Sequence, residues 1–283
     1  MALFTGLFLL DGYLSARAAQ QSLPAGLTGL CFALLCALLS VAGGVELVRL
    51  ARARQINIIL FPALSAIVLV ATHPYWSRNL TDRLACVLAA ALMAGLFFAA
   101  LIQVLKTGNS GAINNLAGTS FSILYLGLGC WFIFQIRLLD SLSVTIWGQI
   151  GPLLLFLACV KSSDIGAYFT GRFLGRHKWV PKISPAKTWE GFFGGIVFSA
   201  IVASIFAYFS DIIDIKRAWL FGAIMALAGQ LGDLLESMLK RDADIKDSAH
   251  IIPEFGGVLD LVDSVIAAAP FALLFLAHWG KGG

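Results

Sequence analysis

The chain has 283 residues, of which 59% are hydrophobic and 13% charged, and its mean hydropathy is +0.87. A water-soluble domain of this length would need far more polar residues to cover its surface, so the composition excludes a soluble globular protein. The formal net charge of +4 suits contact with anionic lipid headgroups and does not indicate nucleic-acid binding. We therefore expect an integral membrane protein.

Apolar runs that are long enough to cross a bilayer as helices follow one another along the sequence. They predict an all-α, polytopic membrane protein with eight or nine transmembrane helices. The runs lack the alternation of apolar and polar residues that is typical of membrane β-barrels. The first run has no basic segment before it and no convincing cleavage site, so we interpret it as a span and not as a signal peptide. The predicted spans are residues 2–18, 27–48, 57–72, 85–105, 117–136, 146–162, 190–210, 218–236 and 258–279.

The Lys and Arg residues are concentrated in loops on one side of this predicted arrangement. With nine spans, the even-numbered loops hold most of them and include the two most polar segments, 172–187 and 237–257. The positive-inside rule places these loops in the cytoplasm. Residues 1–150 carry few charges, so we predict a structural, lipid-facing region there and a catalytic region in residues 151–283.

The first polar cluster begins with Lys161 and Asp164, at the end of a predicted span. Ionisable groups are costly at membrane depth, and where they occur they are commonly functional. The alternative is that Lys161 and Asp164 simply pair with each other at the level of the lipid headgroups.

The same cluster continues into the segment ISPAKTWEG, where Ser184 precedes Pro185. A Ser–Pro step is typical of a helix start, and the free N–H groups of a helix start favour an anion. Lys182 and Lys187 flank this step, which indicates a site for a polyphosphate. The alternative is a basic cytoplasmic loop without a ligand.

The second polar cluster begins inside an apolar run. Asp233, Ser237, Lys240 and Arg241 are spaced so that they share one face of a helix. Asp233 lies at bilayer depth by its sequence context and therefore needs a partner or a cation.

The last predicted span opens with the segment GGVLDLVDS. Gly256 and Gly257 would let backbone N–H groups point at a ligand, and Asp260 and Asp263 share one helical face. Together with Asp233 they supply carboxylates from two helices, the donor type that holds Mg²⁺ beside phosphates. The alternative is that these carboxylates only neutralise Lys240 and Arg241. His250 has no second His or Cys near it, which argues against a zinc site.

No GxxxxGK[ST], HExxH or GxSxG motif occurs in the sequence, and no nucleophile–histidine–acid set is evident. Carboxylates for a metal and basic side chains for phosphates instead favour phosphoryl or nucleotidyl transfer. The cytoplasmic interface is where a soluble nucleotide could meet a lipid.

Residues 237–264 closely resemble the signature of the phosphatidate cytidylyltransferase (CDP-diacylglycerol synthase) family. The segments SDIGAYFTGRFLG, PKISPAKTWEG and GDLLES upstream are also similar to that family, and the likeness covers roughly residues 155–275. The family pattern has Pro-Gly-His-Gly-Gly where this chain has Glu254 and Phe255, and Leu-Asp-Arg where it has Leu261. The positions in register are Ser237, Lys240, Arg241, Lys246, Asp247, Ser248, His250, Pro253, Gly256, Gly257, Asp260, Asp263 and Ser264.

The resemblance implies that CTP and phosphatidic acid react to CDP-diacylglycerol and pyrophosphate at the bacterial inner membrane, in a homodimer among membrane lipids. It implies Mg²⁺ held by Asp233 and Asp260 with Asp263 nearby, and it leaves a second cation open. The catalytic set that it implies is Asp233, Ser237, Lys240, Arg241 and Asp260, in which Lys240 and Arg241 would orient one of the two phosphate groups. The substrate-binding set that it implies is Asp164, Lys182, Ser184, Lys187, Lys246, Asp247, His250, Gly256 and Gly257.

The sequence leaves three alternatives open. A transporter could bind an ion at Asp233 between broken helices. Phe255 and Leu261 motivate a weakened or non-catalytic paralogue that binds lipid. A related CTP-dependent transferase that uses another lipid phosphate would also fit.

Overall fold

The computed structural model describes residues 2–19, 29–77, 84–139, 146–210, 212–245 and 257–280. Within these ranges every regular secondary-structure element is a helix. The β-structure there is a single isolated bridge between Lys178 and Thr188. The predicted all-α fold is therefore confirmed. The elements are α1 (Ala2–Ala19), α2 (Leu30–Ala53), α3 (Leu60–Trp76), α4 (Leu84–Lys106), α5 (Ala112–Ser122), the π-helix η3 (Ile123–Leu128), α6 (Gly129–Leu138), α7 (Ile146–Leu174), α8 (Trp189–Phe209), α9 (Ile215–Asp242) and α10 (Val258–Trp279).

The helices fit a polytopic membrane protein, as predicted. Among the described residues, seven helical segments are long and apolar enough to cross a membrane. A shorter apolar helix, α3, has 17 residues, and α1 has 18 but is not among the seven. The seven are Leu30–Ala53, Val87–Lys106, Ala112–Leu138, Gln149–Leu174, Trp189–Phe209, Ile215–Asp242 and Val258–Trp279.

The chain divides into two compact units, and each is assembled from three chain segments. The division falls within four helices, α1, α6, α9 and α10. The first unit consists of Met1–Asp11, Gly29–Phe134 and Leu239–Leu261, and the second of Gly12–Thr28, Gln135–Met238 and Val262–Gly283.

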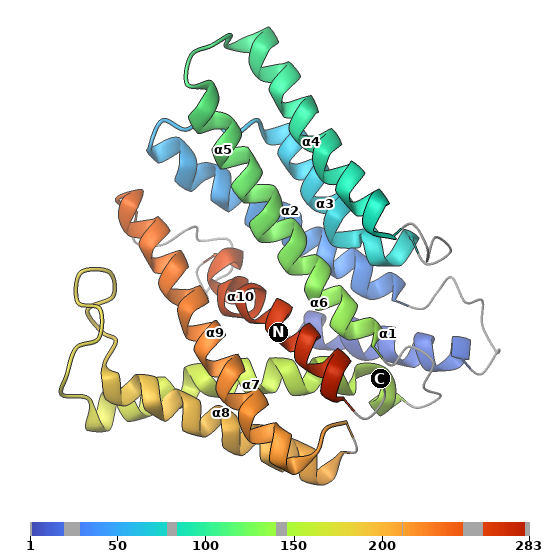
Figure 1. Cartoon of the computed structure of the whole chain (residues 1–283), viewed down its shortest axis with the longest axis vertical. Helices are drawn as coiled ribbons and strands as arrows, with labels where there is room; N and C mark the ends of the chain where they lie inside the picture. Colours follow the sequence, from blue (N-terminus) through green and yellow to red (C-terminus); the bar gives the residue numbers. More distant parts are fainter. Residues whose placement is uncertain are drawn as a thin grey trace. The chain divides into compact units, whose positions relative to one another are not determined.

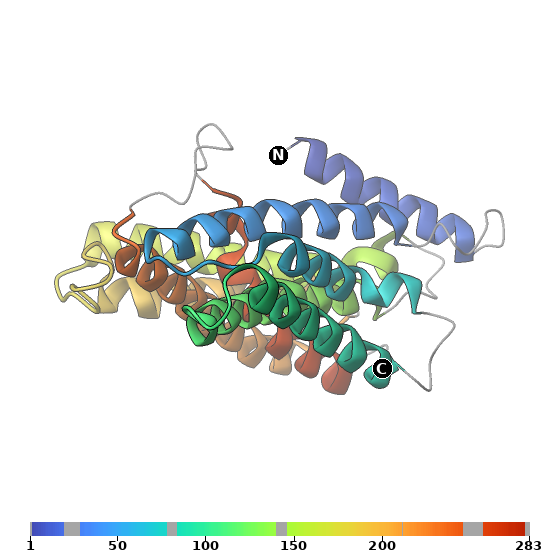
Figure 2. The ribbon, with the colours of Figure 1, turned by 90° about the horizontal axis from the view of Figure 1, so that it is seen from above.

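In the first unit, α3 packs against α2 on one side and α4 on the other (Figures 1 and 2). Ile67, Val70 and Ile123 are almost completely removed from the surface and form part of its apolar interior. Phe32 and Phe134 meet edge to face, with ring centroids 5.4 Å apart. Such packing gives this unit an apolar interior of its own.

In the second unit, α7 and α8 lie side by side as an antiparallel pair (Figure 1). Their backbones approach closely at glycines: a Cβ on Gly166 would lie 2.5 Å from Cβ of Phe198, and one on Gly194 only 2.0 Å from Oγ1 of Thr170. Small residues allow this approach, as is common between membrane helices.

Two local expectations were wrong. Helix α7 does not end near Lys161 and Asp164 but continues to Leu174, so both side chains lie within the helix. The apolar residues that follow them sustain the helix beyond the charged pair.

The Ser184–Pro185 step does not start a helix either. The N–H of Lys187 donates to the carbonyl of Ser184 at 3.2 Å, which makes residues 184–187 a β-turn with Pro185 at its second position. Helix α8 begins at Trp189 instead, and its N-cap is Thr188, whose Oγ1 accepts a hydrogen bond from the Gly191 N–H at 3.1 Å.

Candidate functional site

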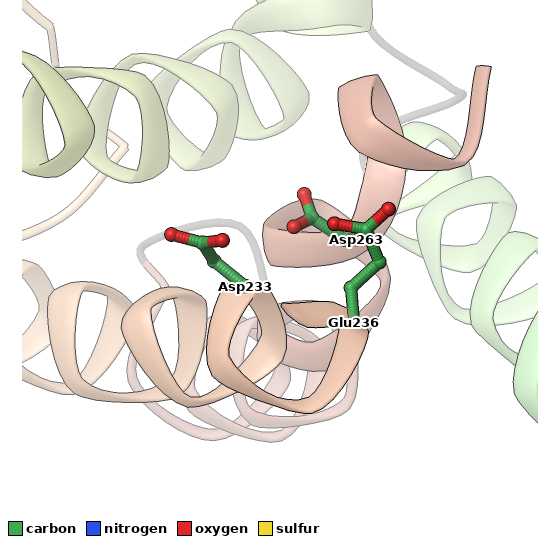
Figure 3. A group of neighbouring side chains, drawn as sticks. All are labelled: Asp233, Glu236 and Asp263. Atoms are coloured by element: carbon green, nitrogen blue, oxygen red, sulfur yellow. The ribbon is translucent and has the colours of Figure 1, made fainter. Parts of the chain in front are cut away.

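Three carboxylates of the second unit form what we call the acidic group: Asp233, Glu236 and Asp263. One oxygen of each lies within 4.8 Å of one oxygen of each of the others. Asp233 and Glu236 are one turn apart on α9, and Asp263 comes from α10 (Figure 3). The sequence predicted Asp233 and Asp263 as metal ligands and missed Glu236. The spacing of Asp233 and Glu236 by three residues was the signal that could have found it.

A glycine on α9 allows α10 to come close enough to form this group. A Cβ on Gly232 would lie 2.5 Å from Cβ of Ala267 and 2.7 Å from the carbonyl oxygen of Asp263. Any larger residue would therefore push α10 away at Asp263.

Two of the three carboxylates in the acidic group lie where little water reaches them, whereas the Asp233 side chain is 42% exposed. Glu236 and Asp263 are each 3% exposed. At 4.8 Å, two carboxylates repel each other by about 3 kcal/mol if the effective dielectric constant is near 20. The N–H of Ser264 donates to Oδ1 of Asp263 at 2.5 Å, and its hydroxyl lies 3.2 Å from the same oxygen. Hard oxygen donors gathered in this way could hold a divalent cation, which would remove the repulsion.

Lys187 provides a positive charge beside the acidic group. Its Nζ lies 3.0 Å from Oδ2 of Asp233, and its side chain is 19% exposed. The loop before α8 fixes this lysine, because the Trp179 N–H donates to the Lys187 carbonyl at 3.1 Å. The Lys187 ammonium also lies 5.9 Å from the centre of the Trp179 ring. The predicted partner for Asp233 is thus found in Lys187.

Lys161 and Asp164 on α7 form an ion pair with an Nζ–Oδ2 distance of 3.4 Å. The sequence left two possibilities for Lys161 and Asp164, a functional role or simple pairing with each other, and the ion pair is the simpler of these. The proposed role of Asp164 in substrate binding stays a prediction.

In the first unit, Lys240 on α9 and Asp260 on α10 form an ion pair with an Nζ–Oδ1 distance of 2.5 Å. Both side chains are well covered, at 13% and 22% exposed. The Gly257 N–H lies 3.3 Å from the other carboxylate oxygen of Asp260, as a backbone donor close to this pair. The sequence left two roles open for Asp260, to bind a metal or to neutralise Lys240. The ion pair is the second of these, and the role of Asp260 as a metal ligand stays a prediction.

The remaining predicted site residues are placed less specifically. Ser237 is half-buried on α9 and Arg241 is exposed in its last turn. Lys182 is exposed in the loop before α8, and Ser184 is half-buried in the turn. Lys246, Asp247, His250 and Gly256 lie outside the described residues, as does Phe255.

Comparison with known proteins gives consistent matches over nearly the whole chain. The sequence pattern of the Cytidylyltransferase family matches residues 22–279. The chain is 33% identical over 249 residues to the phosphatidate cytidylyltransferase of Bacillus subtilis (strain 168), covering 85% of this chain and 87% of that protein. It is also 33% identical over 258 residues to the protein of that name from Staphylococcus haemolyticus, covering 90% and 92% of the two chains. With the protein of that name from Haemophilus influenzae, it shares 43% identity over 128 residues, covering 44% of each.

Proposed function

Because this chain belongs to the cytidylyltransferase family, we propose that it transfers the cytidylyl group of CTP to phosphatidic acid, which gives CDP-diacylglycerol and pyrophosphate. Relatives that match over most of their length carry the name of this activity. The single structural observation that supports it best is the acidic group with Lys187 beside it, because nucleotidyl transfer needs both a cation site and positive charge for phosphates.

In the proposed reaction, an oxygen of the lipid phosphate attacks the α-phosphorus of CTP. A P–O bond forms between them, and the bond from the α-phosphorus to the bridging oxygen of the β-phosphate breaks, so that pyrophosphate leaves with the electron pair. A phosphate monoester is already a nucleophile near neutral pH, so the reaction needs no strong base. The main task of the protein is therefore to position two anionic substrates and to offset their charge.

We propose Mg²⁺ as the cofactor, bound by Asp233 and Asp263, with Glu236 added from the geometry. The donor set fits this ion, because Mg²⁺ prefers carboxylate oxygens and retains sites for water and phosphate. When bound, it would supply neutralisation of phosphate charge. The roles proposed for Asp260 as a further ligand and for a second cation remain predictions.

The basic side chains would bind and orient the phosphates. Lys187 is held beside Asp233 and would turn its charge toward the triphosphate with Lys182. Lys240 is fixed by Asp260 and would orient a second phosphate group with Arg241. Such pre-positioned cations act most strongly where water is scarce.

The remaining assignments follow the sequence prediction. We propose that Ser237 belongs to the catalytic set with Asp233, Asp260, Lys240 and Arg241. We propose that Asp164, Ser184, Lys246, Asp247, His250, Gly256 and Gly257 contribute to substrate binding. We also propose that the protein lies in the bacterial inner membrane as a homodimer, with its site open to the cytoplasm. The distribution of Lys and Arg supports this orientation.

The test is pyrophosphate release by purified protein in detergent with CTP, Mg²⁺ and phosphatidic acid. We expect release that requires both CTP and the lipid, and none with ATP or without lipid. CTP binding without release would favour another lipid phosphate as substrate. If the protein neither binds CTP nor releases pyrophosphate, the proposal is contradicted. That result would favour the non-catalytic paralogue or the transporter.

A further inference from the structure

Glu46 on α2 is a buried carboxylate that caps the first turn of α10. Its side chain is 0% exposed. One carboxylate oxygen accepts a hydrogen bond from the Val258 N–H and the other from the Leu259 N–H, each at 2.8 Å. The first N–H groups of a helix have no partner within it, and the helix dipole favours negative charge at this end. Both oxygens of Glu46 therefore serve to hold α10.

The turn that Glu46 holds also carries Asp260. Asp260 directly follows Leu259, and its carboxylate contacts Lys240 at 2.5 Å. The Val258–Leu259 peptide and Asp260 lie in one helical turn, so a displacement of that peptide would move the Asp260 carboxylate with it. These residues all belong to the first unit.

The same helix, α2, also holds the end of α9, here with the positive charge of Arg54 instead of the negative charge of Glu46. Arg54, the C-cap of α2, donates from Nε to the carbonyl of Asp242, and its Nη2 lies 3.4 Å from Oδ2 of Asp244. Asp244 has a φ of +55°, which closes α9 with a left-handed residue. Helix α2 thus places an anion at the start of α10 and a cation at the end of α9, as the two helix dipoles require.

We propose that Glu46 is a positioning residue for Asp260, and that α2, outside the predicted catalytic region, orients the start of α10 for the reaction. This inference rests on the proposed function. Asp11 offers a matched comparison within the same unit, because it is also 0% exposed and its Oδ1 accepts a hydrogen bond from the Phe32 N–H, at 3.2 Å in the first turn of α2. Asp11 caps the start of α2 itself, but it does so at Phe32, about 20 Å along the helix from Glu46 and its contact with α10.

The experiment compares Glu46→Ala, Glu46→Gln and Asp11→Asn with the wild-type protein. We expect Glu46→Ala to lower kcat about 100-fold, since a small misplacement of a positioned group is that costly, while KM for CTP stays within about twofold. Glu46→Gln keeps one accepting oxygen, so its kcat should lie between the kcat of Glu46→Ala and that of the wild-type protein. Asp11→Asn should keep kcat within about twofold of the wild-type value.

Amide hydrogen exchange gives a readout that does not depend on turnover. The Val258 and Leu259 amides should exchange faster in Glu46→Ala and at the wild-type rate in Asp11→Asn. In a double-mutant cycle, Glu46→Gln should also cost less activity when Lys240→Met has already released Asp260.

The outcomes separate the two proposals. Unchanged exchange at Val258 and Leu259 in Glu46→Ala would overturn the inference. So would faster exchange with a wild-type kcat, an equal kcat loss in Asp11→Asn, or additive effects in the cycle. Wild-type protein that releases no pyrophosphate refutes the proposed function itself, whereas failure of the Glu46 variants alone leaves that function standing.

Discussion

Lys187→Met tests the ion pair beside the acidic group most directly. The substitution keeps an unbranched side chain that is one atom shorter, and it removes the charge that lies 3.0 Å from Asp233. At that distance the attraction is about 5 kcal/mol for an effective dielectric constant near 20. The Asp233 side chain is 42% exposed, so solvent screening and side-chain entropy reduce this value, and we expect a net loss of about 1–2 kcal/mol.

The loss should depend on Asp233 remaining charged. In Lys187→Met, Asp233 faces Glu236 and Asp263 without the lysine ammonium that offsets its charge. The apparent melting temperature should therefore fall by about 2–8 °C. In the double variant Lys187→Met/Asp233→Asn, one carboxylate of the group is also neutral, so most of the stability should return. Activity should fall about 100-fold in the single variant and should not return in the double variant.

Thermal unfolding followed by tryptophan fluorescence and pyrophosphate release would be measured on the same detergent preparations. Lys178→Met is the matched control, because this exposed lysine lies in the same loop and should change neither readout. Additive stability losses in the double variant would refute the pairing with Asp233. Equal effects of Lys178→Met would show that only the overall charge of the loop matters.

Three further predictions concern the cation, the helix contact and the start of α8. Asp263→Asn should raise the Mg²⁺ concentration for half-maximal activity at least about tenfold, and an unchanged metal titration would remove Asp263 from the proposed ligands. Gly232→Ala should destabilise the protein by about 1–3 kcal/mol and lower activity, because its Cβ would meet α10 at 2.5 Å. Gly229→Ala on the same helix has 3.4 Å to its nearest atom and should be tolerated; equal losses would count against the close approach at Gly232. Thr188→Ala should cost about 1 kcal/mol in thermal unfolding because it removes the α8 cap, whereas Ser184→Ala should leave stability within about 0.5 kcal/mol, and the reverse order would contradict the observed helix start.

The helices could be predicted from the sequence because membrane crossing is a local property of composition and length. The predicted span at residues 258–279 has the same bounds as α10, Val258–Trp279. The start of α8 could not be predicted in this way. A Ser–Pro step fits both a helix start and a β-turn, and the contact of Lys178 with Thr188 across the loop accompanies the turn at Ser184.

For the candidate site, the sequence by itself determined which charges sit in apolar surroundings and which of them share a helical face. Asp233, Lys240, Asp260 and Asp263 were found in this way, because helical periodicity and the cost of a buried charge can be read from a single segment.

Only the tertiary structure decided which of these charges meet. It paired Lys187 with Asp233, added Glu236 to the acidic group and brought Glu46 to the start of α10. The physical reason is that periodicity fixes the faces of one helix but not the neighbour that each face contacts. That neighbour is set by close packing between helices, as at Gly232, and by the need to compensate each buried charge and each open helix end.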